Sequence, residues 1–401
     1  MVNLRLILLF FAILPYMTQS LRAQETADTI PPVEISLVTC SPGSEIYELC
    51  GHTALRIKQP PMDIAVNYGT FDFNAPNFVY RFVKGETDYM VTAYPFRYFI
   101  EEYRRSGRSI TEQPLNLTPE EAYTLLAMLQ ENTLPENRTY RYNYVKDNCS
   151  TRPLAIIEKA IGDTITLMAP DKYGSLTSFR DIMRHYHANY PWYQFGIDLA
   201  LGSGIDYPVS DREKAFAPLI LKDMLDNATV KGKRVIKDSE VILPATETGG
   251  PLPATPWYLT PSAIGWLIFA ATAAVAVRDC RRRKVTRWAD AVLFAIYGLC
   301  GVVLTFLVFV SVHEATSPNW LLLWLNPLCL IVPAFIYIKK CGGLVKLYGF
   351  INFASLILLI VMWGWSGQSG NPAFIPLIAA DIILTVRYLY ITLCVEKTIS
   401  A

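Results

Sequence analysis

The chain has 401 residues, of which 52% are hydrophobic and 18% are charged, and its formal net charge is +1. This composition is too apolar for an ordinary soluble enzyme and too charged for a protein lying wholly in a membrane, so it predicts a soluble part joined to a membrane part. The balanced charge argues against a nucleic-acid partner and excludes a long charged, disordered tail.

Residues 1–24 have the pattern of a secretory signal peptide. Arg5 lies in a short leader, residues 6–14 form an apolar core, and Ala23 is a small residue after a polar stretch. Because the apolar run is short for a membrane span, we predict a signal peptide, with a retained anchor as the alternative. In either case the residues that follow are exported.

Charge divides the rest of the chain into two parts. Residues 25–256 carry 23 Lys and Arg against 30 Asp and Glu, whereas residues 257–401 carry 11 against 5. Prolines and glycines gather between these parts. We therefore predict an exported catalytic domain with a helical extension at 25–243, a Pro-rich linker at 244–256 and a transmembrane domain at 257–401.

The transmembrane domain is predicted to have five helices, because five apolar runs each approach the 20 residues that a membrane span requires. They lie at 257–277, 288–312, 320–338, 347–365 and 373–395. Two of the intervening loops, 278–287 and 339–346, are rich in Arg and Lys, and the other two contain neither. The positive-inside rule then predicts a multi-pass membrane protein, with the basic loops and the C-terminus cytoplasmic and the domain before residue 257 on the opposite side. For a bacterial protein this topology corresponds to the inner membrane, with that domain in the periplasm.

The exported domain mixes strand and helix patterns. Residues 34–39, 52–57 and 65–73 read as strands, the last with a bulge at Gly69. Residues 118–132 read as a helix that opens with a capping box. This pattern predicts an α+β domain, followed by the all-α transmembrane domain.

Two short segments, CGHTALR at 50–56 and YVKDNCSTRP at 144–153, carry the candidate chemistry. An amphipathic run follows the second, so Cys149 is predicted at the start of a helix that Asn148 or Asp147 caps. A helix N-terminus lowers the pKa of a thiol, and its free N–H groups can hold an oxyanion. A nucleophilic Cys needs a base, and His52, at a strand start, is the predicted one.

These residues also have structural interpretations. An isolated Cys is often a buried small hydrophobe, and a His on a strand is often structural. Cys50 competes with Cys149 as nucleophile, and His185 and His187 are alternative bases. Cys40 and Cys50 either bridge a short loop or remain buried thiols. No CxxC is present and the chain has only four His, so we predict neither a metal site nor a cofactor.

The residue that orients His52 stays open at this point. Tyr68 and Asp72 on the neighbouring strand and Asp147 before the nucleophile are candidates, with packing or helix capping as the alternative. Arg152 either meets a lipid phosphate or pairs with a surface carboxylate.

Three ionisable residues of the membrane part are further candidates. His313 lies in an outer loop, and Asp381 lies inside the last apolar run, where ionisable groups usually mark pairs or cavities. Arg387 of the same run either pairs or extends toward the cytoplasm.

The order of a His on a strand and a Cys at a helix start resembles the circularly permuted papain-like fold of NlpC-type peptidases and lecithin:retinol acyltransferase. The Asn148-Cys149 step is similar to that of the acyltransferases. The closer resemblance is to the Lnb-type lipoprotein N-acyltransferases of bacteria, which join such an exported domain to a multi-span membrane domain. The similar segments are GHTALR (51–56), NYGTFDF (67–73), GRSITEQPLNLT (107–118), PENRTYRYNYVKDNCSTRP (135–153), PWYQFGIDLALG (191–202) and NWLLLWLNPL (319–328).

The resemblance implies a lipoprotein N-acyltransferase with Cys149 as nucleophile and His52 as general base. The acyl donor would be a membrane phospholipid, the intermediate a thioester on Cys149, and the acceptor the N-terminal Cys amine of a diacylated lipoprotein. Two other functions stay open: a membrane-anchored cysteine peptidase or amidase acting on peptidoglycan, and a non-catalytic lipid-binding module.

Overall fold

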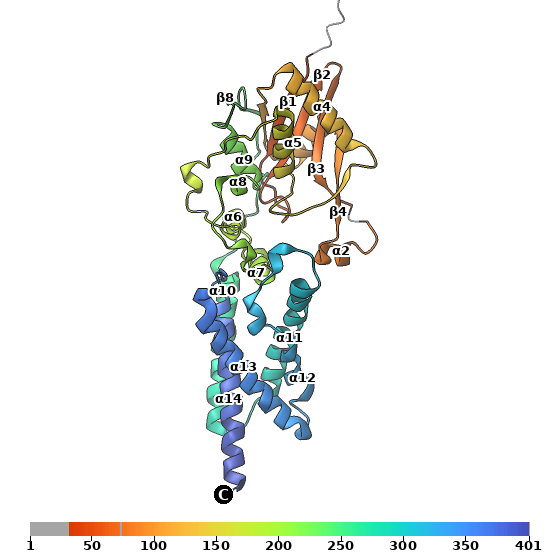
Figure 1. Ribbon diagram of the computed structural model, residues 1–401. Coiled ribbons are helices and arrows are strands. Elements are labelled where there is room, and N and C mark those ends of the chain that lie inside the picture. Colours follow the sequence, from red (N-terminus) through yellow and green to blue (C-terminus); the bar gives the residue numbers. More distant parts are fainter. Residues whose placement is uncertain (1–31, 73, 401) are drawn as a thin grey trace, which may run out of the picture.

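The computed structural model places a sheet-containing domain on one end of a helical bundle (Figure 1). It describes residues 32–72 and 74–400, with side chains described through Cys394. The predicted signal peptide, residues 1–24, lies outside the described residues. The α+β fold class, with the sheet before the all-helical part, is confirmed.

Seven antiparallel strands form the central sheet, in the order β6-β4-β3-β2-β1-β5-β9. They are β1 (Glu34–Cys40), β2 (His52–Gln59), β3 (Met62–Thr70), β4 (Asp88–Pro95), β5 (Ile110–Pro114), β6 (Thr139–Arg141) and β9 (Glu240–Leu243), and a separate hairpin pairs β7 (Thr229–Val230) with β8 (Lys233–Arg234). All three predicted strands are present, although the third both begins and ends three residues earlier than expected, so Asp72 follows the strand and does not lie on it. The predicted bulge in β3 is confirmed, because Gly69 has a φ of 89° and the register with β4 shifts there.

The helices of this domain are α2 (Phe78–Lys84), α3 (Phe96–Arg105), α4 (Pro119–Thr133), α5 (Thr151–Ile161), α6 (Phe179–Tyr186), α7 (Pro191–Ala200), α8 (Asp211–Lys214) and α9 (Pro218–Leu225). Of these, α3 packs on one face of the sheet, and α4, α5 and α9 pack on the other. Because side chains alternate along a strand, Ala54 of β2 packs with α3, whereas Leu55 packs with α4 and α5. The predicted capping box of α4 is present, formed by Thr118 and Glu121.

The segment around α6 and α7 rests on the outer end of the bundle (Figure 1). The Gly202 amide donates to the Ala315 carbonyl at 2.9 Å, and the Arg184 guanidinium donates to the Gly370 carbonyl at 2.9 Å. A Cβ at Gly202 would lie 2.1 Å from the Pro318 carbonyl oxygen. These close contacts hold the sheet domain against the bundle. Farther along, residues 244–256 contain no helix or strand.

Four helices of the described residues are long and apolar enough to cross a membrane. They are α10 (Pro261–Arg282), α11 (Arg287–Phe309), α13 (Gly342–Met362) and α14 (Phe374–Ser400). The third predicted span, 320–338, is instead a series of short helices that together are apolar but shorter than the other four, η5 (Trp320–Leu323), η6 (Pro327–Leu330) and α12 (Ile331–Phe335). Pro327 has no amide to donate, and Asn326 caps the next turn by accepting from the Leu328 amide, so a continuous helix cannot form.

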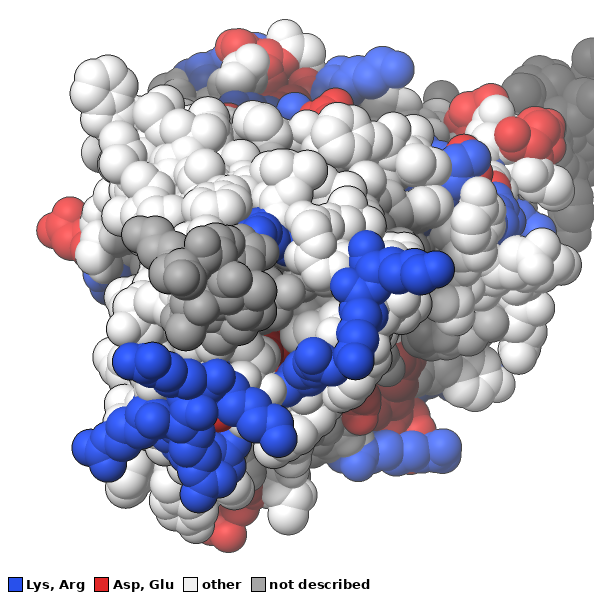
Figure 2. Space-filling view, turned by 90° about the horizontal axis from the view of Figure 1, so that it is seen from below, with Lys and Arg blue, Asp and Glu red and all other residues white. Residues whose placement is uncertain are grey.

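Within the bundle, the charged residues lie mainly at the end away from the sheet. Figure 2 shows Lys and Arg side chains gathered on that end, and the exposed run from Arg281 to Lys284 belongs to this group. Arg387 does not extend toward solvent. It is 2% exposed, and it donates to Asp279 at 3.0 Å and to Asp290 at 2.6 Å. These pairs join α14 to α10 and α11.

Candidate active site

The start of α5 is held by the side chain of Asn148. Its Oδ1 accepts from the Ser150 and Thr151 amides at 2.8 and 3.0 Å, and its Nδ2 donates to the Phe216 carbonyl at 2.9 Å. Of the two caps that the sequence left open, Asn148 therefore holds the helix start, although the residue that directly precedes α5 is Ser150, whose side chain caps no amide. The amides of Ser150 and Thr151 are occupied by this cap, so the expectation that helix-start amides remain free for an oxyanion is wrong for these two.

Cys149 lies two residues before this helix, beside the start of β2 and the end of β3. Burial raises the pKa of its thiol, and the Thr53 backbone amide and the Tyr142 hydroxyl, which hydrogen-bond to it, offset part of the rise. A Cβ added to Gly69 would lie 3.7 Å from Cys149 Cβ and 3.3 Å from the Tyr142 ring. Cys149 therefore contacts β3 at Gly69, which has no side chain. The Thr53 amide and the Tyr142 hydroxyl donate hydrogen bonds to its thiol.

His52 begins β2, one residue before the Thr53 amide that contacts Cys149. Its Nε2 lies 2.5 Å from Asn67 Oδ1. With that oxygen as acceptor, Nε2 carries the proton and Nδ1 keeps its lone pair. Burial lowers the pKa of His52 to about 4, an effect that the hydrogen bond to Asn67 opposes and nearby Arg108 reinforces. The ring is therefore a neutral base at pH 7. Among the described residues, no hydrogen bond joins His52 directly to Cys149.

Asn67 was missed by the sequence analysis, which proposed three other residues to orient His52. Their hydrogen bonds go elsewhere in the structure. The Tyr68 hydroxyl accepts from Asn132 at 3.0 Å, and the Asp72 carboxylate accepts from the Asn74 amide at 2.8 Å. A signal for Asn67 existed, because it lies two residues before the predicted bulge on the strand that was expected to neighbour His52.

The third orienting candidate, Asp147, is engaged by Arg152. The Arg152 guanidinium donates to it from Nη2 at 2.8 Å, and its Nε lies 2.6 Å from the other carboxylate oxygen as an ion pair. The guanidinium also stacks over the Tyr140 ring, 3.5 Å from the ring centroid. Arg152 therefore has the carboxylate partner that was one of its two predicted roles. The pair fixes the turn that leads to Cys149.

The other exported cysteines lie near the same strand ends. Cys40 and Cys50 are free thiols, so they do not form the bridge considered above. Cys50 Sγ lies 3.4 Å from the Tyr144 hydroxyl, and burial raises its pKa to about 12. Within residues 32–72 and 74–400 no group of three or more His, Cys, Asp or Glu side chains is placed to hold a metal ion.

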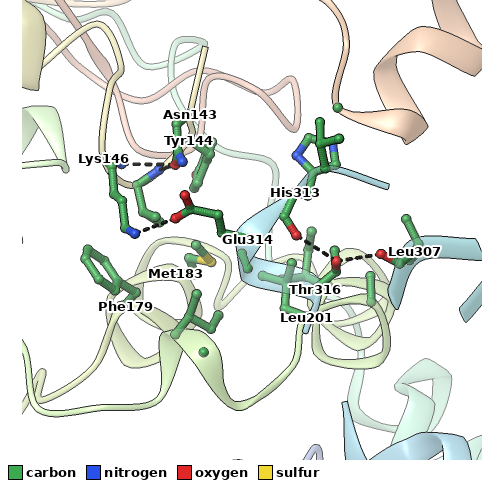
Figure 3. Close-up of a pocket in the computed structure, with 18 of the residues that line it drawn as sticks. Asn143, Tyr144, Lys146, Phe179, Met183, Leu201, Leu307, His313, Glu314 and Thr316 are labelled. Carbon is green, nitrogen blue, oxygen red and sulfur yellow. Dashed lines mark hydrogen bonds and ion pairs between the residues drawn. The ribbon is translucent and has the colours of Figure 1, made fainter. Parts of the chain in front are cut away.

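A cavity of about 550 Å³ lies between the sheet domain and the bundle (Figure 3). Its walls are mainly apolar and aromatic, and Tyr142, the donor to Cys149, is one of them. Lys146 and Glu314 form an ion pair at this cavity, and the two side chains point toward each other in Figure 3. The predicted outer-loop residue His313 also lines it, and its Nε2 lies 2.9 Å from the Phe82 carbonyl oxygen.

Two further predicted residues have structural partners. Asp381 is buried in the bundle, where it accepts from Asn352 at 2.7 Å and from Thr385 at 3.1 Å. The bond from Asn352 joins α13 to α14, and the bond from Thr385 lies within α14. His187, an alternative base, is buried with its Nδ1 2.8 Å from Gln194 Oε1, and it lines the cavity.

Two family models match the chain. Residues 22–186 match the Lnb N-terminal periplasmic domain, and residues 253–398 match the Lnb transmembrane domain. The first match contains both Cys149 and His52, and the two matches together cover most of the chain. No curated protein and no solved structure matches it.

Proposed function

Because this chain belongs to the Lnb family, with a periplasmic N-terminal domain on a multi-pass membrane domain, we propose that it is a lipoprotein N-acyltransferase. It moves one fatty acyl chain from a membrane phospholipid to the N-terminal Cys amine of a diacylated lipoprotein. The two basic loops at the far end of the bundle, together with the C-terminus, face the cytoplasm.

The observation that carries this proposal is the environment of Cys149. Its thiol has an amide donor from Thr53 and a hydroxyl donor from Tyr142, and Tyr142 in turn lines an apolar cavity next to the bundle. Amide and hydroxyl donors stabilise the negative charge that develops on a thiolate and on an oxyanion. Both substrates are anchored in the membrane, so a nucleophile at this junction reaches them without extracting either one.

In the first step, His52 Nδ1 takes the thiol proton and Cys149 Sγ attacks the ester carbonyl carbon of the phospholipid. The tetrahedral oxyanion accepts from the Thr53 amide, and its collapse breaks the ester C–O bond. His52 returns the proton to the leaving glycerol oxygen. A lysophospholipid departs, and a thioester stays on Cys149.

In the second step, the α-amine of the lipoprotein attacks the thioester carbonyl, and His52 accepts a proton from the amine. The C–S bond breaks, the amide is complete, and the proton returns to Cys149. The transfer from ester to amide is thus divided into two displacements, and the reactive thioester is the intermediate between them. Asn67 orients His52 through Nε2 in both steps, and the ring reaches the thiol when substrate tightens the site.

The direct test is reconstitution of the full-length protein with a diacylated lipopeptide, with and without phospholipid. The proposal predicts a triacylated lipopeptide only when phospholipid is present. Failure of this conversion in a folded protein with an intact Cys149 would contradict it. Cleavage of peptidoglycan fragments without lipid would instead support the peptidase function.

A further inference from the structure

The cavity beside Cys149 extends to the level of the membrane helices. Val303 and Leu307 of α11 line it, and α11 ends at Phe309. Val303 therefore lies about 9 Å along the helix from that outer end, at 1.5 Å per residue. Its side chain is 56% exposed. The lower end of the cavity thus borders a surface that faces lipid.

The helix α2 forms the neighbouring wall and is apolar on its outer side. Val79, Tyr80 and Phe82 are 73%, 56% and 48% exposed, and α2 contains no buried residue. Such a surface is costly in water and favourable in the headgroup and acyl boundary of a bilayer. Its basic residues, Arg81 and Lys84, pair with Asp88 and Glu86, so it is the apolar side chains that favour this boundary.

Contacts hold α2 against the outer end of α11. The Tyr80 and Phe306 ring centroids lie 6.2 Å apart, and the Val312 amide donates to the Lys84 carbonyl at 2.9 Å. Gly85 permits this close approach, because a Cβ there would lie 3.0 Å from a Val312 methyl group. The exposed face of α2 and the exposed Val303 therefore flank one entrance.

The upper end of the cavity leads toward the nucleophile. Tyr142 lines the cavity and hydrogen-bonds to the Cys149 thiol. Between the two ends lie apolar side chains of the extension, the segment that contains α6 and α7. Met183 and Ile197 are two of them, and Figure 3 labels Met183. The volume, about 550 Å³, falls in the range of about 300–1,000 Å³ that small-molecule sites occupy.

We propose that this cavity binds one acyl chain of the phospholipid donor, which enters laterally from the outer leaflet between α2 and α11. This inference rests on the proposed function and adds where the donor binds. The donor is favoured over the lipoprotein because the entrance borders the lipid bilayer, in which phospholipid is the surrounding solvent. A chain in the cavity brings its ester past Tyr142 to Cys149.

The test is photo-crosslinking of the full-length Cys149→Ser protein in phospholipid vesicles, so that no acyl transfer consumes the probe. One arm uses phosphatidylethanolamine with a photoreactive group near the end of an acyl chain. The other uses a diacylated lipopeptide that carries the same group. Peptide mapping then locates the label.

The phospholipid probe is expected to label the extension around Met183 and Ile197, which lies outside the bundle helices. Val303→Trp should reduce that label severalfold, because the indole fills the entrance. Val302→Trp is the matched control, since Val302 is 46% exposed on the same helix and does not line the cavity. Alkylation of Cys149 in otherwise unchanged Val303→Trp and Val302→Trp proteins, together with their melting temperatures, shows that both fold.

Three results would overturn the inference: label confined to the bundle helices, equal label in the two Trp variants, or label of the extension by the lipopeptide alone. The proposed function fails separately. If the extension is labelled but the protein with Cys149 never forms an acyl-enzyme, the lipid site stands and the transfer does not. If an acyl-enzyme forms but the extension is not labelled, the transfer stands and the lipid site does not.

Discussion

Cys149 and Cys50 lie in two neighbouring regions that share burial and differ in hydrogen-bond donors. Their exposed fractions are nearly equal, 8% and 9%, and each thiol lies beside a tyrosine hydroxyl. Burial raises the pKa of both thiols, and for Cys50 it reaches about 12. Only Cys149 also has a backbone amide of the sheet, from Thr53.

The difference teaches that burial alone does not separate a structural thiol from a reactive one. What distinguishes Cys149 is a donor fixed by the β2 backbone and a helix start pinned by Asn148, because the tyrosines beside both thiols line the cavity. Fixed donors need no reorganisation when charge develops, so they contribute more than mobile ones. The predictions below test whether this difference carries the activity.

The largest effect is expected for Cys149→Ser, with Cys50→Ser as its control. Loss of the nucleophile should lower acyl transfer by at least about 10³-fold. Cys50→Ser should stay within about twofold of wild type, because the account gives Cys50 no part in the reaction. The measurement is the rate of lipopeptide acylation by each variant. Equal losses in both would remove the distinction between the two regions.

The next effect is that of His52→Gln, which keeps a polar side chain but removes the base. A reduction of about 10²-fold is expected, the usual contribution of a positioned general base. Since burial lowers the pKa of His52 to about 4, wild-type activity should fall only as pH drops toward 4. The rate as a function of pH measures this. A fall in rate with its midpoint near pH 6.5 would contradict the role of His52 as the base. The same fall in rate in His52→Gln would contradict it as well.

Gly69→Ala tests the close approach of Cys149 and Tyr142 to β3. The new Cβ would lie 3.3 Å from the Tyr142 ring at a φ of +89°, so a loss of about tenfold in rate is expected, together with about 1–2 kcal/mol of stability. Gly162→Ala is the matched control. Gly162 also has a positive φ, of +71°, but nothing lies within 4 Å of its Cβ position. Acylation rates and melting temperatures of both variants separate strain from a local effect.

The lowered pKa of His52 also predicts a smaller effect, on stability. Between about pH 6.5, the pKa of an unfolded His, and about pH 4, the unfolded state binds a proton that the folded state does not. Stability should therefore fall as pH drops through this window and level off below it. The melting temperature of His52→Gln should depend less on pH there. Identical pH profiles would show that His52 is not held neutral.

The smallest effect concerns thiol reactivity in the unmodified protein. Because both pKa values are raised, alkylation of Cys149 and of Cys50 should still increase with pH above 9. Cys149 should react faster at each pH, since its amide donor favours the thiolate. Peptide mapping after brief iodoacetamide treatment compares the two sites. Faster modification of Cys50 would reverse the comparison.

Local patterns in the sequence predicted much of this site. Alternation placed β2, and the amphipathic run after Cys149 placed the start of α5. One feature depended on a contact distant in sequence and was missed, because the bond between His52 and Asn67 follows from strand pairing. The sequence offered Asn148 as one of two caps, but it did not show that this cap occupies two of the amides expected to hold an oxyanion.

The membrane part shows the same limit. Composition identified the apolar runs, but Asn326 and Pro327 interrupt one of them. Likewise, the pairing of Arg387 with Asp279 and Asp290 links three helices and cannot be derived from the spacing within one. Charge at a single position indicates that a partner is needed, and only the packed bundle identifies it.

The central claim is that Cys149 carries the acyl group. Intact-protein mass spectrometry of the detergent-purified protein, incubated with phospholipid alone, tests it most directly. The account predicts a mass gain of one fatty acyl group that hydroxylamine removes, present in Cys50→Ser and absent in Cys149→Ser. No adduct in a protein whose Cys149 still reacts with iodoacetamide, or an adduct that survives in Cys149→Ser, would contradict it.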